Sequence, residues 1–328
     1  MVIFSFLDIF LGSVMIPFKD VVRIIFTGSS ERHEWVSIVH DFRIPKALTA
    51  ILSGAALSVS GLQMQTIFRN PLAGPYVLGI SSGAGLGVAI IILCFSSLFS
   101  FRLLGIAGDW VIVLAAWAGA GSILMLILAV SVRVRDIMTI LILGILFGAA
   151  TTSVLSILQY FSNESMLKTF IVWTMGSLGS VTGKQIPVLS FCILAGLIIT
   201  IFSSKILNAM LLGENYAKTM GMNIKLTRLL VFTSTSMLAG TVTAFCGPIG
   251  FIGIAVPHIT RFAFKTANHN FLIPGTILTG AIIMLVSDII SQLPGLENNL
   301  PVNSVTALLG IPIIIWIIIR NYNVSSLS

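Results

Sequence analysis

Charged side chains are scarce in this sequence. Lys, Arg, Asp and Glu make up 9% of the 328 residues, whereas 56% are hydrophobic, and soluble domains usually carry about 25% charged residues. A chain of this length with a mean hydropathy of +1.06 has too little polar surface to fold as a water-soluble globule. The shortage of charge therefore indicates an integral membrane protein, with the lipid bilayer as its solvent.

Cysteine and nucleotide-binding sequence are lacking as well. Three cysteines occur far apart, at Cys94, Cys192 and Cys246, so the sequence shows neither a disulfide framework nor a metal-ligand spacing. It contains no phosphate loop of the form GxxxxGK[ST], so the chain cannot be its own ATP-driven motor. No convergent catalytic set is visible either. We expect no enzymatic activity, no catalytic residues, no metal and no cofactor.

Long apolar runs between charged residues predict an all-α, polytopic membrane protein of about ten transmembrane helices. About 20 apolar residues cross roughly 30 Å of hydrocarbon as a helix. The run between Arg228 and Arg261 is too long for one crossing and is interrupted by Gly and Pro, so we divide it into two spans. The expected spans are 2–17, 46–67, 79–99, 111–131, 137–158, 186–204, 228–247, 249–265, 271–292 and 302–319.

An even number of spans places both termini on one side. If that side is the cytoplasm, only Asp136 and Glu214 among the acidic residues lie inside, and the basic residues show a modest inside bias. The net charge of +7 then reflects topology, and it indicates no nucleic-acid partner. The first span is short and contains Asp8. No low-complexity linker divides the chain, so we expect one membrane domain over residues 1–328.

A polar stretch, LLGENYAKTMGMNIKLTR at residues 211–228, stands between two apolar runs. On a continuous helix it would carry a stripe of small residues beside a row of larger apolar ones. The small residues are Gly213, Ala217 and Gly221, and the apolar row is Leu212, Tyr216 and Met220. This periodicity leaves two interpretations open, a surface on which another protein docks and a plain connector at the membrane surface.

Four stretches in chain order resemble the motifs of one family. They are GAALSVSGLQMQTIFRNPLAGPYVLGISSGAGLGV (54–88), LLGENYAKTMGM (211–222), GPIGFIGIAVPHITR (247–261) and NLPVNSVTALLGIPIIIWII (299–318), the last with Asn303 where Gly is usual. By these motifs the chain is similar to the FecCD, or BtuC-like, permeases of ABC importers for iron-siderophores, haem or cobalamin. The resemblance extends from about residue 12 to residue 320.

The resemblance implies a BtuC-like permease of a type II importer that moves an iron chelate into the cell, with ferric siderophore as first choice and haem or cobalamin next. It implies a second permease subunit, identical or paralogous, and two copies of a cytoplasmic ABC ATPase. It also implies an extracytoplasmic substrate-binding lipoprotein or periplasmic protein. The location implied is the bacterial cytoplasmic membrane, with many passes and both termini in the cytoplasm.

The same resemblance assigns roles to particular residues. The coupling segment, at about 205–227, is implied to meet the ATPase through Leu212, Gly213, Ala217 and Gly221. DFRIPK at 41–46 is similar to an element that meets acidic side chains of the binding protein, which implies docking by Arg43 and Lys46; interfacial charges that only anchor the helix are the alternative. Motif residues expected to support packing are Asn70, Pro71, Gly250, Pro257, His258, Arg261 and Pro301.

A different class of function is also open to this sequence. An ion- or proton-coupled secondary transporter would show inverted halves and charged residues near the membrane midplane, and the sequence shows neither clearly. Asp288 lies near the outer end of its span, where a structural hydrogen bond to a neighbouring helix and a role in transport are both conceivable.

Overall fold

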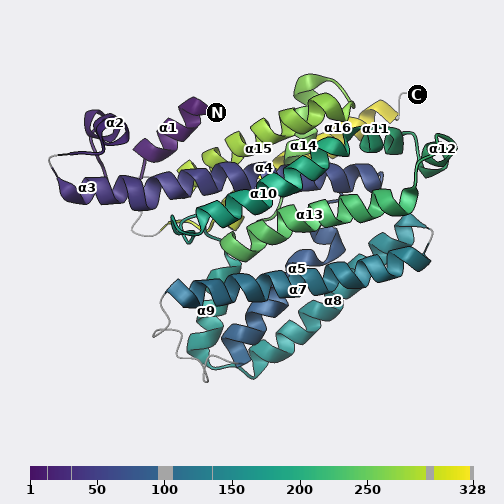
Figure 1. The fold of residues 1–328 in the computed structure, drawn as a ribbon, viewed down its shortest axis with the longest axis horizontal. Helices are drawn as coiled ribbons and strands as arrows, with labels where there is room; N and C mark the ends of the chain where they lie inside the picture. The colour runs from purple at the N-terminus through teal and green to yellow at the C-terminus, as the bar shows by residue number, and fades with distance from the viewer. Residues whose placement is uncertain (13, 31, 95–105, 135, 293–298, 326–328) are drawn as a thin grey trace.

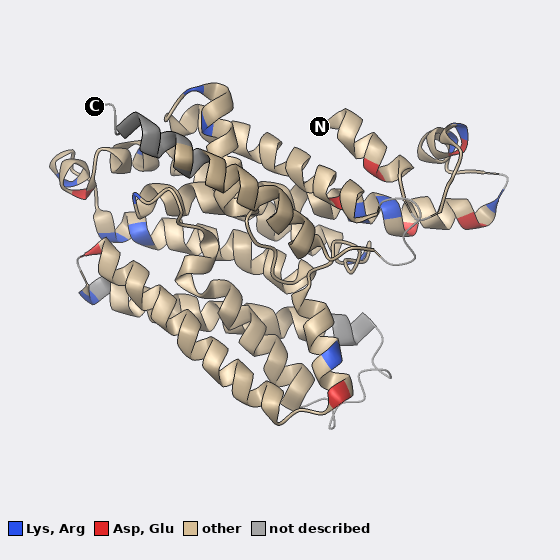
Figure 2. Ribbon diagram, turned by 180° about the vertical axis from the view of Figure 1, so that it is seen from behind, with Lys and Arg blue, Asp and Glu red and all other residues tan. Residues whose placement is uncertain are grey.

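Helices account for all the regular structure that is described in this chain. The computed structural model describes all residues except 13, 31, 95–105, 135, 293–298 and 326–328, and the described residues contain no strand. Most of the long helices run roughly side by side (Figure 1). Charged residues lie mainly toward the two ends of this bundle, and few lie in its middle (Figure 2). The expectation of an all-α, polytopic membrane protein is confirmed.

The helices fall in the following order. The N-terminal part contains α1 (Val2–Phe10), α2 (Phe18–Thr27), α3 (His33–Ser37), η1 (Ile38–Arg43), α4 (Ile44–Ile67), η2 (Pro75–Leu78), α5 (Ile80–Ala89) and η3 (Ile90–Cys94). The middle contains α7 (Ile106–Arg133), α8 (Ile137–Tyr160), α9 (Glu164–Thr174), α10 (Ile186–Phe202), α11 (Ser204–Leu211) and α12 (Glu214–Thr219). The C-terminal part contains α13 (Ile224–Cys246), α14 (Ile252–Phe264), α15 (His269–Ser291) and α16 (Val302–Ser325).

Each expected span has a helical counterpart, but their lengths differ. Within the described residues, five helices are long and apolar enough to cross a membrane, and the bent pair α10–α11 would be a sixth. Three shorter apolar helices occupy the expected spans at 79–99, 249–265 and 302–319. The part of span 79–99 beyond Cys94 lies outside the described residues.

The expected first span is wrong in its extent. The helix α1 ends at Phe10 instead of continuing to residue 17, and Leu11 is already extended. A new helix, α2, then begins after Pro17. Nine residues of α-helix measure about 14 Å, which is half of the hydrocarbon thickness. The sequence also gave no indication of α2 or α9 as separate helices.

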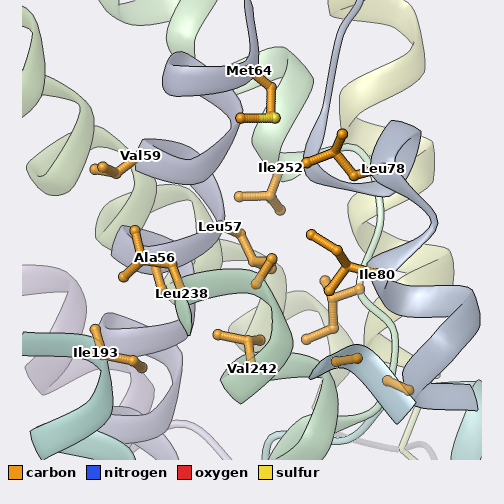
Figure 3. Packing of buried hydrophobic residues seen from close by; sticks show 14 of the residues in the cluster. Ala56, Leu57, Val59, Met64, Leu78, Ile80, Ile193, Leu238, Val242 and Ile252 are labelled. Atoms are coloured by element: carbon orange, nitrogen blue, oxygen red, sulfur yellow. The ribbon is translucent and has the colours of Figure 1, made fainter. Parts of the chain in front are cut away.

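The helix α4 forms the centre of the molecule. It continues α3 and η1 in one helical stretch, His33–Ile67, and it packs against α10, α13, α14 and α15. A second group, made of α5, α7 and α8, packs against α13 from the other side. Figure 3 shows Leu57 of α4, Ile80 of α5 and Val242 of α13 in the shared apolar core. The helix α13 thus lies between the two groups.

Glycines let α4 approach its neighbours at backbone distance. A Cβ atom placed on Gly54 would lie 2.3 Å from the carbonyl oxygen of Gly280, and one on Gly61 would lie 1.7 Å from that of Gly253. Small residues are common at such crossings, because lipid supplies no hydrophobic drive between helices and close van der Waals contact must replace it. The positions of α14 and α15 therefore depend on these glycines.

We predict that Gly61→Ala destabilises the protein strongly, because the added methyl group would overlap a backbone carbonyl that cannot rotate away. Overpacking of this kind typically costs about 1–3 kcal/mol or more. Gly85→Ala is the matched control, since a Cβ at Gly85 meets no atom within 4 Å. The measurement is the thermal unfolding midpoint in detergent. Equal midpoints for the two variants would contradict the close packing of α4 on α14.

Candidate functional site

A short segment, α11–α12, connects α10 to α13 outside the long helices. The helix α11 bends away from α10 by 53°. The helices α11 and α12 lie at the same end of the bundle (Figure 1). It occupies the region in which the coupling segment is expected, at about 205–227, and we keep that name for it. It is the first candidate for a surface that meets another protein.

The stripe of small residues expected on this segment is not a continuous helical face. The helix α12 covers only Glu214–Thr219, and Gly213 and Gly221 lie at its two ends with φ angles of 108° and 82°. Residues other than glycine rarely adopt these φ angles, so both glycines serve as turn residues. Ala217 is fully buried and faces the rest of the chain. The geometry therefore turns the Gly213 and Ala217 face inward.

The larger apolar residues face outward instead. Leu212, Tyr216 and Met220 expose 61%, 52% and 60% of their surface. These three residues, which we call the exposed row, sit on a segment that also carries Asn215 and Lys218 as exposed polar residues. Exposed apolar side chains with a polar border, on and beside a short helix outside the spans, have the composition of a protein contact surface.

The inner face of α12 is held by a buried arginine. Arg228, near the start of α13, donates from Nη2 and Nε to the same carboxylate oxygen of Glu214, at 2.7 and 3.1 Å. Its Nη1 donates to the carbonyl oxygen of Val134 at 3.1 Å. Only 5% of the Arg228 side chain is exposed. From the sequence, Arg228 was only the boundary of an apolar run, because periodicity does not indicate contacts with Glu214 and Val134.

A histidine network holds α11 in a similar way. The side-chain oxygen of Asn208 accepts a hydrogen bond from the backbone N–H of His269 at 2.8 Å and lies 2.9 Å from its Nδ1. The other ring nitrogen of His269 lies 2.8 Å from the hydroxyl of Thr66, at the end of α4. His269 is fully buried. The network ties the coupling segment to α4 and α15, and no sequence signal indicated it.

The loop between α7 and α8 lies next to the coupling segment. Val134 belongs to this loop, and Asp136 caps the start of α8 by accepting hydrogen bonds from the hydroxyl and backbone N–H of Thr139, at 2.8 and 2.9 Å. The hydroxyl bond, followed by the backbone bond, holds the pKa of the exposed Asp136 carboxyl below its usual range. The cap therefore keeps its charge at neutral pH.

At the opposite end of the bundle, Arg43 has partners within the chain. Its guanidinium donates to the carbonyl oxygens of Ile9 and Phe10 at 2.8 and 2.9 Å, and also to that of Val14. The carbonyls of Ile9 and Phe10 lie at the end of α1, where a cation is favourable. Arg43 is buried, so in this structure it holds the N-terminal helix in place.

Lys46 is paired as well. Its ammonium lies 3.0 Å from a carboxylate oxygen of Asp288, which is fully buried on α15. The second oxygen of Asp288 accepts from Nε2 of Gln292 at 2.6 Å, and Asp8 is buried beside the pair. The structure thus provides the hydrogen bond to a neighbouring helix that was one of the two interpretations of Asp288.

Arg43 and Lys46 also line a cavity at this end. The cavity has a volume of about 500 Å³, and its walls come from the ends of several helices. Residues in its wall include Phe42, Met175, Ser177, Gln292, Asn299 and Pro301. Both predicted docking residues therefore border an opening, although their charged groups are engaged within the chain.

The remaining motif residues pin loops to helices. Asn70 accepts from the backbone of Leu72 at 2.9 Å, and Nε2 of His258 lies 2.8 Å from the carbonyl oxygen of Pro71. Arg261 of α14 donates to the side-chain oxygen of Gln65 at 2.6 Å. The backbone N–H of Gly250 donates to the side-chain oxygen of Asn303 at 2.9 Å. Pro257 lies inside α14, and Pro301 precedes α16. The bond to Gly250 gives Asn303 a structural use that glycine would lack.

No cluster of metal ligands accompanies these contacts. Among the residues that the structure describes, no group of three or more His, Cys, Asp or Glu side chains could hold a metal ion. The polar contacts found here hold helices and loops together, and the two ends of the bundle are the places where other molecules could bind.

Comparison with known proteins points to one family. The model of the FecCD transport family matches residues 1–320. The chain is 35% identical over 88% of its length to the vitamin B12 import system permease protein BtuC of Salmonella typhi, covering 87% of that protein. It is 33% identical over 94% of its length to the hemin transport system permease protein HmuU of Yersinia pestis, covering 90% of that protein.

A solved structure agrees with these relatives. The chain matches an inward-facing conformation of a metal-chelate type ABC transporter with a TM-score of 0.81 and 26% identity, over 97% of this chain and 96% of the other. The fold and the order of the motifs are therefore similar along nearly the whole length of the chain.

We predict that Lys46→Met destabilises the protein more than the double variant Lys46→Met/Asp288→Leu. The single change leaves a carboxylate buried without its cation, which typically costs about 3–5 kcal/mol, whereas replacing a whole buried pair by apolar residues is often nearly neutral. Lys184→Met is the control, because Lys184 is exposed. Thermal unfolding in detergent gives the comparison. A double variant at least as unstable as Lys46→Met alone would contradict the pairing.

Proposed function

The chain belongs to the FecCD transport family and is a permease of a type II ABC importer, and on this premise we propose that it carries an iron chelate. Ferric siderophore is our first choice, followed by haem and cobalamin. The cargoes named for the relatives are vitamin B12, hemin and a metal chelate. Each is a complex of a metal with an organic ligand, which supports a metal chelate as the cargo. The proposed location is the bacterial cytoplasmic membrane, with both termini in the cytoplasm.

The exposed row, Leu212, Tyr216 and Met220, is the observation that carries the proposed mechanism. We assign to it the contact with a separate cytoplasmic ATPase, two copies of which would serve a pair of permease subunits, identical or paralogous. In this arrangement Leu212 touches the ATPase, while Gly213, Ala217 and Gly221 shape the segment that presents the row. The geometry supports this division of roles, because Ala217 is buried and the row is exposed.

At the other end of the bundle, we assign to Arg43 and Lys46 the surface that meets an extracytoplasmic binding protein, either a lipoprotein or a periplasmic protein. Lys46 lies in the wall of the cavity at this end of the bundle. An acidic side chain of the binding protein that enters the cavity could compete with Asp288 for the ammonium of Lys46. Arg43 would act mainly by holding α1 beside the opening, because its guanidinium is already bonded to backbone carbonyls.

We predict that Tyr216→Asp reduces co-purification of the ATPase by at least about tenfold. Truncating a hot-spot residue of an interface, often a Tyr, costs about 2 kcal/mol or more, and the new carboxylate would lose its water on contact. Insertion should be normal, because α12 lies outside the long apolar helices. The measurement is the amount of ATPase retained on the affinity-purified permease.

Asn215→Asp is the matched control for this experiment, since it adds the same charge at the neighbouring exposed position, outside the exposed row. It should retain the ATPase nearly as well as the unmodified chain. If Tyr216→Asp and Asn215→Asp retain equal amounts, the row is not the ATPase contact, and α12 is only a connector.

A further inference from the structure

Arg228 joins two cytoplasmic segments that are distant in the sequence. Two of its nitrogens bond to Glu214, the first residue of α12, and a third bonds to the carbonyl of Val134, in the loop that links α7 to α8. A guanidinium can do this because its donors are fixed in a planar fork and point in different directions. One side chain therefore contacts the coupling segment and the α7–α8 loop at once.

The bonds are protected from water, which makes them stronger than surface contacts. The exposed fraction of the side chain is 5% for Arg228 and 18% for Glu214. Buried charge-assisted hydrogen bonds are short and resist separation, because each freed group would remain desolvated. The contact should therefore persist when an external force moves α12.

The two segments belong to different parts of the bundle. The coupling segment is linked through Asn208 and His269 to α4 and α15, in the group around the central helix. The helices α7 and α8 pack against α5, in the second group. Val134 follows α7 directly and Asp136 caps α8, so these two residues have little freedom to move without the helices. A displacement of α12 would therefore reach the central group through His269 and the second group through Arg228.

We propose that Arg228 is a positioning residue for transport, which makes α12 and the α7–α8 loop one mechanical unit. When the ATPase pushes on the exposed row, Arg228 carries that motion to α7 and α8, in addition to the path through His269 to α4 and α15. This inference rests on the proposed function, since it assumes that α12 receives the ATPase. It adds a second group of helices to those that the ATPase moves.

The experiment measures whether the two segments move together. Spin labels are placed at Arg133 and Lys218, both exposed, in a full-length chain whose Cys94, Cys192 and Cys246 are changed to Ala. The distance between the labels is recorded in the assembled complex with ADP and with ATP and vanadate. We expect one narrow distance distribution that is the same in both nucleotide states.

Two substitutions of Arg228 then test whether its side chain holds α12 and the α7–α8 loop together. Arg228→Lys keeps the charge but loses the fork, and Arg228→Gln loses both. In each variant, we expect the distribution to shift or broaden on addition of ATP and vanadate, and stimulation of ATP hydrolysis by the binding protein to fall by about fivefold or more, within the usual range for coupling between sites. Lys225→Gln removes an exposed cation from the same turn of α13 and should change neither readout.

The exchange variant Glu214→Arg/Arg228→Glu separates the two contacts. It can restore an ion pair with α12, but a carboxylate at position 228 cannot donate to the Val134 carbonyl. We expect it to remain uncoupled. Full recovery would overturn the proposal, because the loop contact would then be unnecessary.

The unmodified chain provides a test that does not depend on how the variants fold. Suppose that the ATPase assembles and hydrolyses ATP on the unmodified chain, but the distance between the labels at positions 133 and 218 changes with nucleotide. This result would overturn the inference and leave the proposed function intact. If instead no ATPase associates with the unmodified chain, the proposed function itself fails, and the inference fails with it.

Discussion

Water is absent from the middle of a bilayer, so each polar side chain on a spanning helix needs a partner inside the protein. The amide of Gln63 on α4 shows how this constraint orders the helices. It donates to Thr200 of α10 at 3.0 Å and accepts from Thr235 of α13 at 3.0 Å. These bonds fix the rotation of three helices about their axes. The close glycine contacts of α4 with α14 and α15 then complete a tightly packed central group.

The same constraint explains where the protein can meet other molecules. Many polar groups within the bundle hold helices together, as Lys46 and Asp288 do. The exposed features lie at the ends of the bundle, where α12 presents apolar side chains at one end and a cavity opens at the other. A transport subunit that takes its energy from one partner and its cargo from another needs this distribution, with a tightly packed body between two contact surfaces.

The long spans could be predicted from the sequence, because apolar length alone decides whether a helix crosses a bilayer. The end of α1 could not, since it depends on Arg43 bonding to the carbonyls of Ile9 and Phe10, which local sequence does not reveal. The polar stretch at 211–228 does contain a short helix, as its periodicity indicated, but the face expected to be outward is buried. Helical periodicity assumed an unbroken helix, whereas Gly213 and Gly221 adopt positive φ angles that end it. The hydrogen bonds of Arg228 and the network at His269 join residues that are distant in the chain, and periodicity carries no information about such contacts.

The central claim is that this chain moves a metal chelate by means of ATP hydrolysed on a separate subunit. The most direct measurement is uptake into proteoliposomes that contain the chain with its ATPase and binding protein, using a ferric siderophore, haemin and cyanocobalamin as probes. The account predicts uptake of one of these chelates that requires ATP hydrolysis and persists when an ionophore collapses the proton gradient. Uptake that proceeds without the ATPase and follows the proton gradient would contradict it and would identify a secondary transporter.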